Sequence, residues 1–536
     1  MQRKNNLLLV VLLLSTAFLQ AQNKSKITWG KESTEPAGTA ISKIVSWNKD
    51  GFFALRLKQA TGNNAADGPS KVILERYNSS MNLVKSRQLS LKIKKKKRQF
   101  EDLMVIGGQL YFFTSFNNQA KKKNYLFAQR IDSKELRPNS DLRFIADIDT
   151  KNKYQEGAFN FHISRDSSKV LIYNQLPYKK NNPERFALRV FDNEMQELWS
   201  KDIKLPYDDN QFAVEDYQVD NDGNVYLLGV LYLDASLVRR RGKPNYKYVI
   251  LAYNKSGEEL TKYKIDLEQK FLTDLTFRVA DNGELICSGF YSEKGTYSMK
   301  GTYFFRVDPK EKRVFNKNAK DLDFDFRAEY VSEKKKGKLK NREQEGKKSL
   351  ELYSYSLDHL ILRNDGGALL IAEQYYVEEQ IDNSYGYGGF NNYNGVVRYD
   401  YYYNYNDIII VNINPNGEVE WSARIPKRQE TRNDGGYFSS YAMSIVRDKI
   451  YFIYNDNARN FAVDKKDNRF YNYNGSNSII AQTAVYQDGE VSTAPLFENS
   501  DARIITRPKV CRQTGKKEMV IFGERGRRSR FGKILF

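Results

Sequence analysis

The feature that most constrains the fold of this chain is a unit of strand-like segments and tight polar turns that recurs along nearly its whole length. Each unit contains an alternating apolar segment, a tight turn, a strongly apolar segment, a longer connection and a second hairpin. The first turns of the eight units are Asp50-Gly51, Gly107-Gly108, Asp166-Ser167-Ser168, Asp222-Gly223, Asn282-Gly283, Asp365-Gly366, Asp448-Lys449 and Gly515. Because Gly and Asn adopt the positive φ angles that two-residue hairpins need, this pattern predicts eight similar antiparallel sheets.

The two ends of the chain complement each other. Seven units contain the second hairpin, whereas the eighth stops after its third strand, in the terminal sequence RFGKILF. Conversely, Ile27, Thr28 and Trp29 form a lone strand-like segment before the first unit begins near Ile41. We expect this segment to pair with the last unit as its missing fourth strand. Such pairing closes a ring of sheets and removes the edge strands that would template aggregation.

A closed array of this kind resembles the β-propellers over nearly all of residues 22–536. One motif, Phe161 to Tyr173 (FHISRDSSKVLIY), is similar to the TolB-type propeller repeat, with Ser167 where glycine is usual. The resemblance implies an all-β fold, a single β-propeller of eight four-stranded blades closed by the N-terminal strand. The units repeat at about 55 to 83 residues, against roughly 40 to 50 in common blades, which indicates long loops. A seven-bladed ring and two packed sandwiches are the alternatives.

The N-terminus predicts export. A basic start and an apolar run at 7–14 precede the small residues Ala17 and Ala21. This order is typical of a signal peptide, which we place at residues 1–21, ahead of a propeller domain at 22–536. The apolar run is shorter than the roughly 20 residues that span a bilayer, and no later run approaches that length, so we expect no transmembrane segment. We therefore expect a periplasmic, cell-surface or secreted protein of a bacterial envelope.

The composition restricts the chemistry that the chain can support. Tyr (37) and Phe (31) are abundant, which favours a β-rich core, but there are only two His and two Cys. His162 and His359 are too few for a structural or three-His zinc site, and no G-x-S-x-G motif is present. We expect no metal and no cofactor. Cys287 and Cys511 are expected to be free thiols, with a disulfide between them as the alternative.

The connections between strands carry the most distinctive residues. In a propeller, the connections from second to third strands and from blade to blade emerge on one face, and the tight turns emerge on the other. The long basic segments of this chain, which has a net charge of +20, fall in the first class. The candidate binding residues among them are Lys121, Lys122, Lys123, Arg239, Arg240, Arg241, Lys243, Arg525, Arg527 and Arg528. Two further basic runs, 92–98 and 333–348, are predicted to lie between blades. The alternative is that these charges only solvate the loops.

Residues 382–406, DNSYGYGGFNNYNGVVRYDYYYNYN, are the most unusual stretch of the chain. Tyrosine offers a rigid stacking face and a hydroxyl, and Asn and Gly add adaptable polarity, a mixture used by binding loops. We interpret the stretch as a recognition loop with Tyr385, Tyr387, Tyr393 and Tyr401 as candidate contacts. The alternative is a low-complexity segment that drapes over the rim or extends a hairpin.

Together these features predict an exported, non-catalytic binding or scaffold propeller. Its basic, Tyr/Asn-rich loop face would engage an anionic polysaccharide, a lipopolysaccharide or an envelope protein, and we disfavour nucleic acid as the partner. The alternative is a carbohydrate-active enzyme that uses paired carboxylates at the channel mouth. The acids available in first strands are Glu101, Asp102, Glu215, Asp216, Asp274 and Asp358. Hydrogen bonding within the first-strand layer is the competing explanation for these acids.

Overall fold

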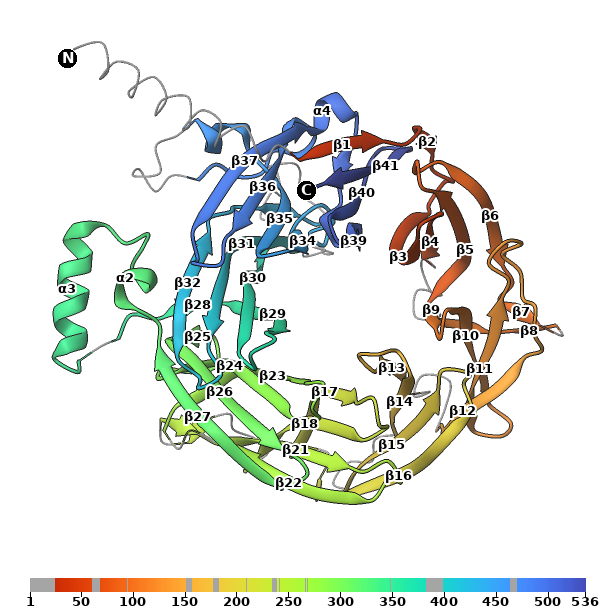
Figure 1. The fold of residues 1–536 in the computed structure, drawn as a ribbon, viewed down its shortest axis with the longest axis horizontal. Helices are drawn as coiled ribbons and strands as arrows, with labels where there is room; N and C mark the ends of the chain where they lie inside the picture. Colours follow the sequence, from red (N-terminus) through yellow and green to blue (C-terminus); the bar gives the residue numbers. More distant parts are fainter. Residues whose placement is uncertain are drawn as a thin grey trace, which may run out of the picture.

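A computed structural model describes residues 25–59, 68–93, 95–150, 157–176, 183–208, 210–233, 239–240, 242–265, 267, 269–347, 349–381, 399–462 and 470–536. The described strands form eight antiparallel sheets arranged in a ring around a central axis (Figure 1). The protein is therefore an eight-bladed β-propeller, as predicted, and the seven-bladed and two-sandwich alternatives are excluded. The predicted signal peptide lies outside the described residues. No helix in the described ranges is both long and apolar enough to cross a membrane.

Each blade contains four strands that pair in order from the central axis outward. In the first blade these are β3 (Ala40–Asn48), β4 (Gly51–Gln59), β5 (Pro69–Asn78) and β6 (Leu83–Leu89). The second blade consists of β9 (Gln99–Ile106), β10 (Gln109–Asn118), β11 (Lys123–Ile131) and β12 (Arg143–Asp149). The third consists of β13 (Phe159–Ile163), β14 (Lys169–Gln175), β15 (Pro183–Asp192) and β16 (Glu197–Asp208). The fourth consists of β17 (Phe212–Val219), β18 (Val225–Tyr232), β21 (Tyr246–Tyr253) and β22 (Glu259–Ile265). The fifth blade consists of β23 (Phe271–Val279), β24 (Leu285–Ser292), β26 (Gly301–Asp308) and β27 (Arg313–Asp321). The sixth consists of β29 (Tyr355–Leu362), β30 (Ala368–Ile381), β31 (Tyr399–Ile413) and β32 (Val419–Ile425). The seventh consists of β34 (Tyr441–Val446), β35 (Lys449–Asp456), β36 (Ile479–Val485) and β37 (Val491–Glu498).

The eighth blade joins the two ends of the chain. Its inner position is divided between β38 (Ile505–Thr506) and β39 (Arg512–Gly515), with the short helix η5 (Pro508–Val510) between them. The middle strands are β40 (Glu518–Arg525) and β41 (Arg528–Leu535). The outer strand is β1 (Lys26–Trp29), which pairs antiparallel with β41 so that Trp29 lies opposite Gly532. The predicted closure of the ring by the N-terminal strand is confirmed.

The tight turns lie where the sequence places them in five blades and are shifted by one residue in the other three. In the first blade Asn48 pairs with Gly51, and in the eighth Gly515 pairs with Glu518, so each predicted glycine lies in a strand next to its turn. In the seventh blade Val446 pairs with Lys449, so the turn residues are Arg447 and Asp448 rather than the predicted Asp448 and Lys449. Arg447 adopts φ 56°, a left-handed conformation that Gly107 and Gly108 supply in the turn of the second blade. The sequence signal was therefore one residue out of register because an arginine occupies the glycine position.

The hydrophobic core lies between consecutive blades. Leu228 and Ile250 of the fourth blade pack in one cluster with Phe277 and Phe305 of the fifth, and all four are fully buried. The middle strands are buried on both faces, so they are nearly continuous apolar runs such as LICSGFYS in β24. Cys287 belongs to this core, and Cys511 lies near the inner edge of the eighth blade; both are free thiols, as expected.

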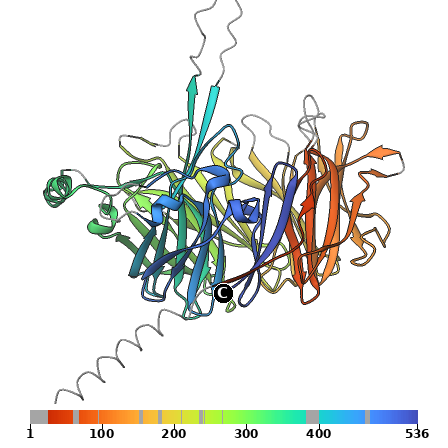
Figure 2. The ribbon, with the colours of Figure 1, turned by 90° about the horizontal axis from the view of Figure 1, so that it is seen from above.

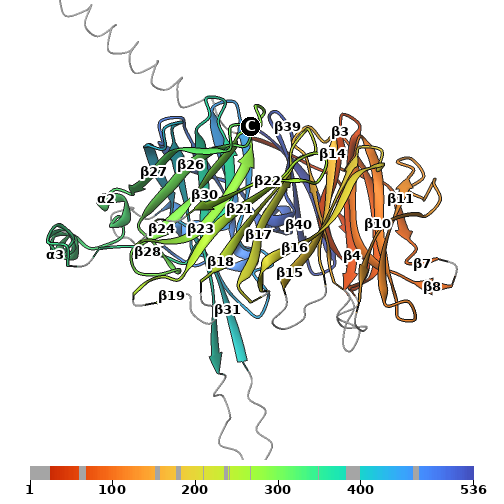
Figure 3. The same cartoon turned by 90° about the horizontal axis from the view of Figure 1, so that it is seen from below.

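An insertion interrupts the ring after the fifth blade. It contains α2 (Phe324–Arg327) and α3 (Glu333–Gln344) and lies at the outer side of the ring (Figures 1 and 3). The basic run at 333–348 was predicted as a connection on the loop-bearing face. Over its described residues it is instead mainly a helix displaced outward, because its lysine-rich sequence has strong helix propensity.

Candidate functional site

The ring has two different faces. Connections from second to third strands and from one blade to the next must share one face, which we call the loop face; the tight turns define the opposite turn face. The hairpin β30–β31 projects on the loop face, and the small hairpin of β7 (Lys92–Ile93) and β8 (Lys96–Lys97) extends outward at the edge of the ring (Figures 1 and 3). The loop face is therefore the irregular surface of the molecule.

The hairpin β30–β31 rises well beyond the loop face (Figure 2). Its strands have 14 and 15 residues, and Tyr375 pairs with Tyr405, Val377 with Tyr403 and Ile381 with Tyr399. Residues that pair directly project on the same side of an antiparallel sheet. One side therefore carries a row of tyrosines, which we call the tyrosine ladder: Tyr375, Tyr399, Tyr401, Tyr403 and Tyr405.

The ladder is unusually accessible for aromatic side chains. Tyr399 is 46% exposed, and Tyr375 and Tyr401 are each 39% exposed. A two-stranded ribbon is marginally stable in water by itself. Here a third strand, β33 (Glu430–Arg432), pairs with β31, and Asp400 forms an ion pair with Arg432. The ribbon is thus a supported platform that exposes tyrosine rings.

A lysine stands at the foot of the ladder. Lys509, from η5 of the eighth blade, donates from Nζ to the Tyr405 hydroxyl at 2.8 Å and to the Gly436 carbonyl at 3.1 Å. Its Nζ lies 4.1 Å from the centroid of the Tyr405 ring, which is itself 4.6 Å from the ring of Tyr375. Burial lowers the pKa of Lys509. A cation and two tyrosine rings inclined at 40° therefore lie in contact at this place.

Below the ladder, the hairpin is fixed by a buried ion pair. The Lys427 side chain is fully buried and its Nζ lies 2.8 Å from Glu373 Oε1. The same Nζ donates to the Tyr405 carbonyl at 2.6 Å, and Ser440 Oγ donates to Glu373 Oε2 at 2.7 Å. This network joins both hairpin strands to the sixth and seventh blades.

The predicted basic residues lie around the rim rather than in one cluster. Lys121 and Lys122 are exposed between β10 and β11, but Lys123 is paired with Asp147 and Asp149. Lys243 is exposed in β20 (Lys243–Pro244), which pairs with β19 (Arg239–Arg240) through its backbone. These residues belong to the second and fourth blades, so they are well separated along the ring.

Arg525 is exposed, whereas its two predicted neighbours help to close the ring. Arg527 donates from Nε and Nη2 to the Glu35 carbonyl at 3.3 Å, and Arg528 lies 3.6 Å from Glu32. Among the predicted tyrosines, Tyr401 belongs to the ladder. Arg241, Tyr385, Tyr387 and Tyr393 lie outside the described residues.

Sequence reasoning missed Lys509 and Tyr375. It singled out the stretch 382–406, which contains Tyr399, Tyr403 and Tyr405, but named only Tyr401 of the ladder as a contact. The alternation of tyrosine at 399, 401, 403 and 405 was a readable signal for a strand face, because side chains two residues apart share a side. The position of Lys509 carried no such signal, since it depends on the closing blade reaching the hairpin of a blade far away in sequence.

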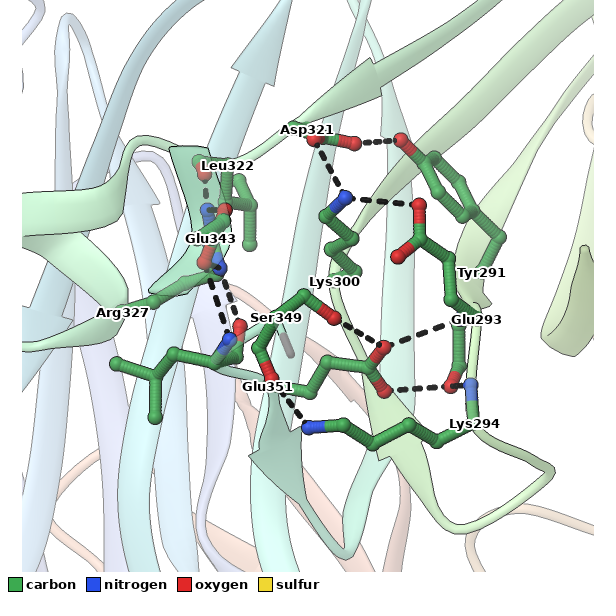
Figure 4. Close-up of polar contacts among 12 residues, drawn as sticks. Tyr291, Glu293, Lys294, Lys300, Asp321, Leu322, Arg327, Glu343, Ser349 and Glu351 are labelled. Carbon is green, nitrogen blue, oxygen red and sulfur yellow. Dashed lines mark hydrogen bonds and ion pairs between the residues drawn. The ribbon is translucent and has the colours of Figure 1, made fainter. Parts of the chain in front are cut away.

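The helical insertion presents a second basic surface. No residue of α3 is buried, and its basic residues are Lys334, Lys335, Lys336, Lys338, Lys340 and Arg342. The helix is held at its end because Glu343 forms a two-point ion pair with the buried Arg327, at 2.7 and 3.1 Å, and also accepts from the Leu350 amide (Figure 4).

The end of the insertion is fastened to the fifth blade by further polar contacts. Lys294 donates to the Ser349 carbonyl at 2.5 Å, and Glu351 accepts from Ser292 Oγ at 2.6 Å and from the Glu293 amide at 3.1 Å (Figure 4). Within the blade, Lys300 lies between Glu293 and Asp321, at 2.8 and 3.1 Å. A helix that is polar all round gains little from burial, so these contacts hold its charges in place.

The first-strand acids are bonded to adjacent blades. Asp216 accepts from Thr276 Oγ1 at 2.9 Å, Asp274 accepts from the Leu357 amide at 2.7 Å, and Asp358 accepts from the Tyr441 hydroxyl at 2.8 Å. Asp102 pairs with Lys43 at 2.5 Å. These contacts link the inner strands around the ring. They agree with the explanation that the acids serve hydrogen bonding within the first-strand layer.

Some of these acids nevertheless have strongly altered acidity. Bulges in β9, β17 and β29 occur at Glu101, Glu215 and Asp358, and a bulge redirects a side chain out of the regular alternation. Burial, reinforced by Glu373, raises the pKa of Asp358 to about 7, and burial raises the pKa of Asp274 to about 6.

The two histidines have neutral, structural surroundings. Burial lowers the pKa of His162 to about 4, and its Nδ1 accepts from the Val219 amide at 3.3 Å. Burial also lowers the pKa of His359, whose ring lies 6.3 Å from that of Tyr441. Within the described ranges, no group of three or more His, Cys, Asp or Glu residues is placed to hold a metal ion.

Comparison with known proteins identifies no family. No family model matches the chain, and no curated protein matches its sequence. Among solved structures, the WD40 domain of SCAP from fission yeast is 9% identical with a TM-score of 0.38, over 96% of this chain and 95% of that one. The β-propeller domain of the Trilobed protease from Pyrococcus furiosus is 10% identical with a TM-score of 0.34, over 87% and 97%.

Prolyl oligopeptidase B from Galerina marginata is 13% identical with a TM-score of 0.30, and the match covers 63% of this chain. The match spans 39% of the length of that enzyme. Likeness at this level says nothing of ligand or activity, so the function has to be inferred from the residues of this chain.

Proposed function

We propose that the protein is an exported binding module for an acidic polysaccharide, which it engages on the loop face. The tyrosine ladder with Lys509 at its foot is the observation that carries the proposal. Sugar rings present apolar C–H faces that pack on aromatic rings, while tyrosine hydroxyls bond to sugar hydroxyls. A lysine beside them suits the carboxylate of a uronic acid, because a charge-assisted hydrogen bond is stronger than a neutral one.

The basic rim supports the same class of ligand. Lys121, Lys122, Lys243 and Arg525 are exposed on the loop face, and α3 adds a basic helix at the outer side. Cations that are spread around a rim suit a polymer better than a small ion, because a polymer reaches several of them at once. Their summed field raises the local concentration of a polyanion, and added salt screens it within about 10 Å at 0.1 M.

A binding titration tests this function. Alginate serves as the uronic acid polymer and dextran as the neutral polymer, with affinity measured by calorimetry at low and high salt. We expect alginate to bind and dextran not to bind. Substitution of Tyr401 and Tyr403 by Ala is expected to weaken alginate binding at least about tenfold, since each lost aromatic contact contributes about 1 kcal/mol.

The matched control is Phe144→Ala. Phe144 is 52% exposed and lies on β12, the outer strand of the second blade, whereas the ladder belongs to the sixth. We expect this control to bind like the wild type. Equal loss in the control and the ladder variant, or equal affinity for dextran and alginate, would contradict the proposal.

Paired carboxylates support a second candidate function, a carbohydrate-active enzyme. Asp274 and Asp358 lie on adjacent inner strands, and both have pKa values raised toward neutrality, as a general acid requires. The test is release of reducing ends from alginate. Activity that Asp358→Asn abolishes would favour the enzyme, and binding without turnover by the wild type favours the binding module.

A further inference from the structure

The turn face contains a cavity that is separate from the tyrosine ladder. Its volume is about 870 Å³, and it lies at the inner ends of the third to sixth blades. Ligand cavities in proteins usually measure about 300 to 1,000 Å³. The turns around Asp222 and Asn282 form part of its wall. The cavity therefore has the size of a small-molecule site and opens on the face that the proposed polysaccharide does not use.

The inner wall of the cavity is mainly apolar, with His162, Gln218 and Arg278 as its polar members. Ile163, Val219, Val279, Leu360 and Leu362 line it from the inner strands of four blades. Leu360 is 5% exposed and Val219 is 2% exposed, so their side chains already pack in the ring. Contact with this wall requires a ligand with an apolar body.

The mouth of the cavity is basic. Lys255 comes from the outer turn of the fourth blade, and Lys310 and Lys312 come from the outer turn of the fifth. All three are exposed, and within the described part of the chain none of them has a carboxylate partner. Arg165 and Arg278 add two further cations to the lining.

The acids of the lining offset this charge only in part. Asp220 accepts hydrogen bonds from the amides of Asp222 and Asn224, at 2.9 and 2.8 Å, and from Asn224 Nδ2 at 2.6 Å. Asp281 lies 3.2 Å from Arg165 and is paired with it. With Asp222, three carboxylates face five cations in the lining, an excess of two positive charges. Because Arg165 is near Asp281 and Arg278 lies 3.5 Å from Asp216, the three lysines are the cations without a carboxylate beside them.

We propose that this cavity binds an organic anion that has an apolar body and a phosphate or carboxylate group. The apolar body packs on the inner-strand wall, and the anionic group lies at the mouth among Lys255, Lys310 and Lys312. Lysine suits such a mouth because its flexible stem and three donors adjust to anions of different shape. The site is independent of the proposed polysaccharide function because it uses other residues on the opposite face.

The test uses three probes on the full chain, with binding followed by calorimetry. 1-Naphthyl phosphate carries both an apolar body and charge, 1-naphthol lacks the charge, and inorganic phosphate lacks the apolar body. We expect 1-naphthyl phosphate to bind at least about tenfold more tightly than either of the others, since it makes both kinds of contact. Equal binding of 1-naphthol or of inorganic phosphate overturns the proposal, as does no binding of 1-naphthyl phosphate at millimolar concentration.

Two cavity variants and one control locate the site. Lys310→Ala with Lys312→Ala should weaken 1-naphthyl phosphate binding about tenfold, since two partly exposed charge contacts are lost. Ser256→Trp, in an exposed turn at the lining, should block the cavity and abolish binding while the melting temperature stays unchanged. Lys516→Ala with Lys517→Ala removes the same charge from a turn of the eighth blade and should leave binding unchanged. Binding that survives both cavity variants, or that the control reduces equally, overturns the assignment.

Discussion

Because the N-terminal strand closes the ring, we expect substitution of one of its residues, Trp29, to lower the stability of the protein strongly. Its ring lies over Gly532 of β41, where an added Cβ would stand 2.7 Å from the indole. It also meets the Phe497 ring edge-on at 5.1 Å and lies 5.2 Å from the Arg530 guanidinium. These contacts join the first strand of the chain to the seventh and eighth blades, so Trp29 stabilises the closed ring.

We expect Trp29→Ala to reduce the free energy of unfolding by about 2 to 3 kcal/mol. A fully buried Trp→Ala substitution costs about 3 to 5 kcal/mol, and the estimate is lower here because Trp29 is only partly buried. About 1 kcal/mol of the loss belongs to the edge-on pair with Phe497. The same geometry predicts that Gly532→Val destabilises the protein, because the new side chain meets the indole.

The assay is urea unfolding followed by circular dichroism, with a double-mutant cycle of Trp29→Ala and Phe497→Ala. The cycle should give a coupling energy of about 0.5 to 1.5 kcal/mol between the two rings. Phe144→Ala is the control, since Phe144 is 52% exposed on the outer strand of the second blade, away from the closure. A Trp29→Ala variant within about 0.5 kcal/mol of the wild type, the range of ordinary surface substitutions, would refute closure as the role of this strand.

Three further predictions concern buried polar groups. Lys427→Met leaves Glu373 buried without its cation and should cost about 3 to 5 kcal/mol in urea unfolding; a loss below 1 kcal/mol would contradict the buried pair. Burial raises the pKa of Asp456 from 3.8 to about 6, so the ionised carboxylate destabilises the fold by about 3 kcal/mol above pH 6, and this penalty develops as the pH rises from about 4. The free energy of unfolding of Asp456→Asn, relative to that of the wild type, should therefore be about 3 kcal/mol higher at pH 7 than at pH 4. A difference between the two proteins that does not depend on pH would refute this prediction. Arg327→Met removes the two-point pair with Glu343, and hydrogen exchange in α3 should accelerate while the blades keep their protection; unchanged exchange in α3 would argue against the clamp.

The sequence predicted the ring well because each blade repeats the same local chemistry. Asp222-Gly223 and Asn282-Gly283 specify tight hairpins from their own residues, and the unpaired segment at Ile27 matched a unit that lacked its fourth strand. Such signals are local or concern the two chain ends, so they need no knowledge of packing. The shifted turn at Arg447 shows the limit, since a non-glycine residue in a left-handed conformation has no strong sequence signature.

The candidate site was predicted less completely because it depends on contacts between distant parts of the chain. The contact of Lys509 with Tyr405 joins residues 104 positions apart. Arg527 and Arg528 were predicted as binding residues but contact Glu35 and Glu32 in the N-terminal segment, a pairing that only ring closure creates. Charge alone did not distinguish the helix α3 from a basic loop, and the contact of Glu343 with the buried Arg327, which holds the end of the helix, had no signal in the sequence.

Hydrogen–deuterium exchange of the protein with and without alginate shows directly which surface binds the polysaccharide. We expect slower exchange in β30, β31 and the segment around Lys509, with no change in the turns of the opposite face. Protection confined to the turn face, or none in the described part of β30 and β31 under saturating alginate, would contradict the tyrosine ladder as the binding surface.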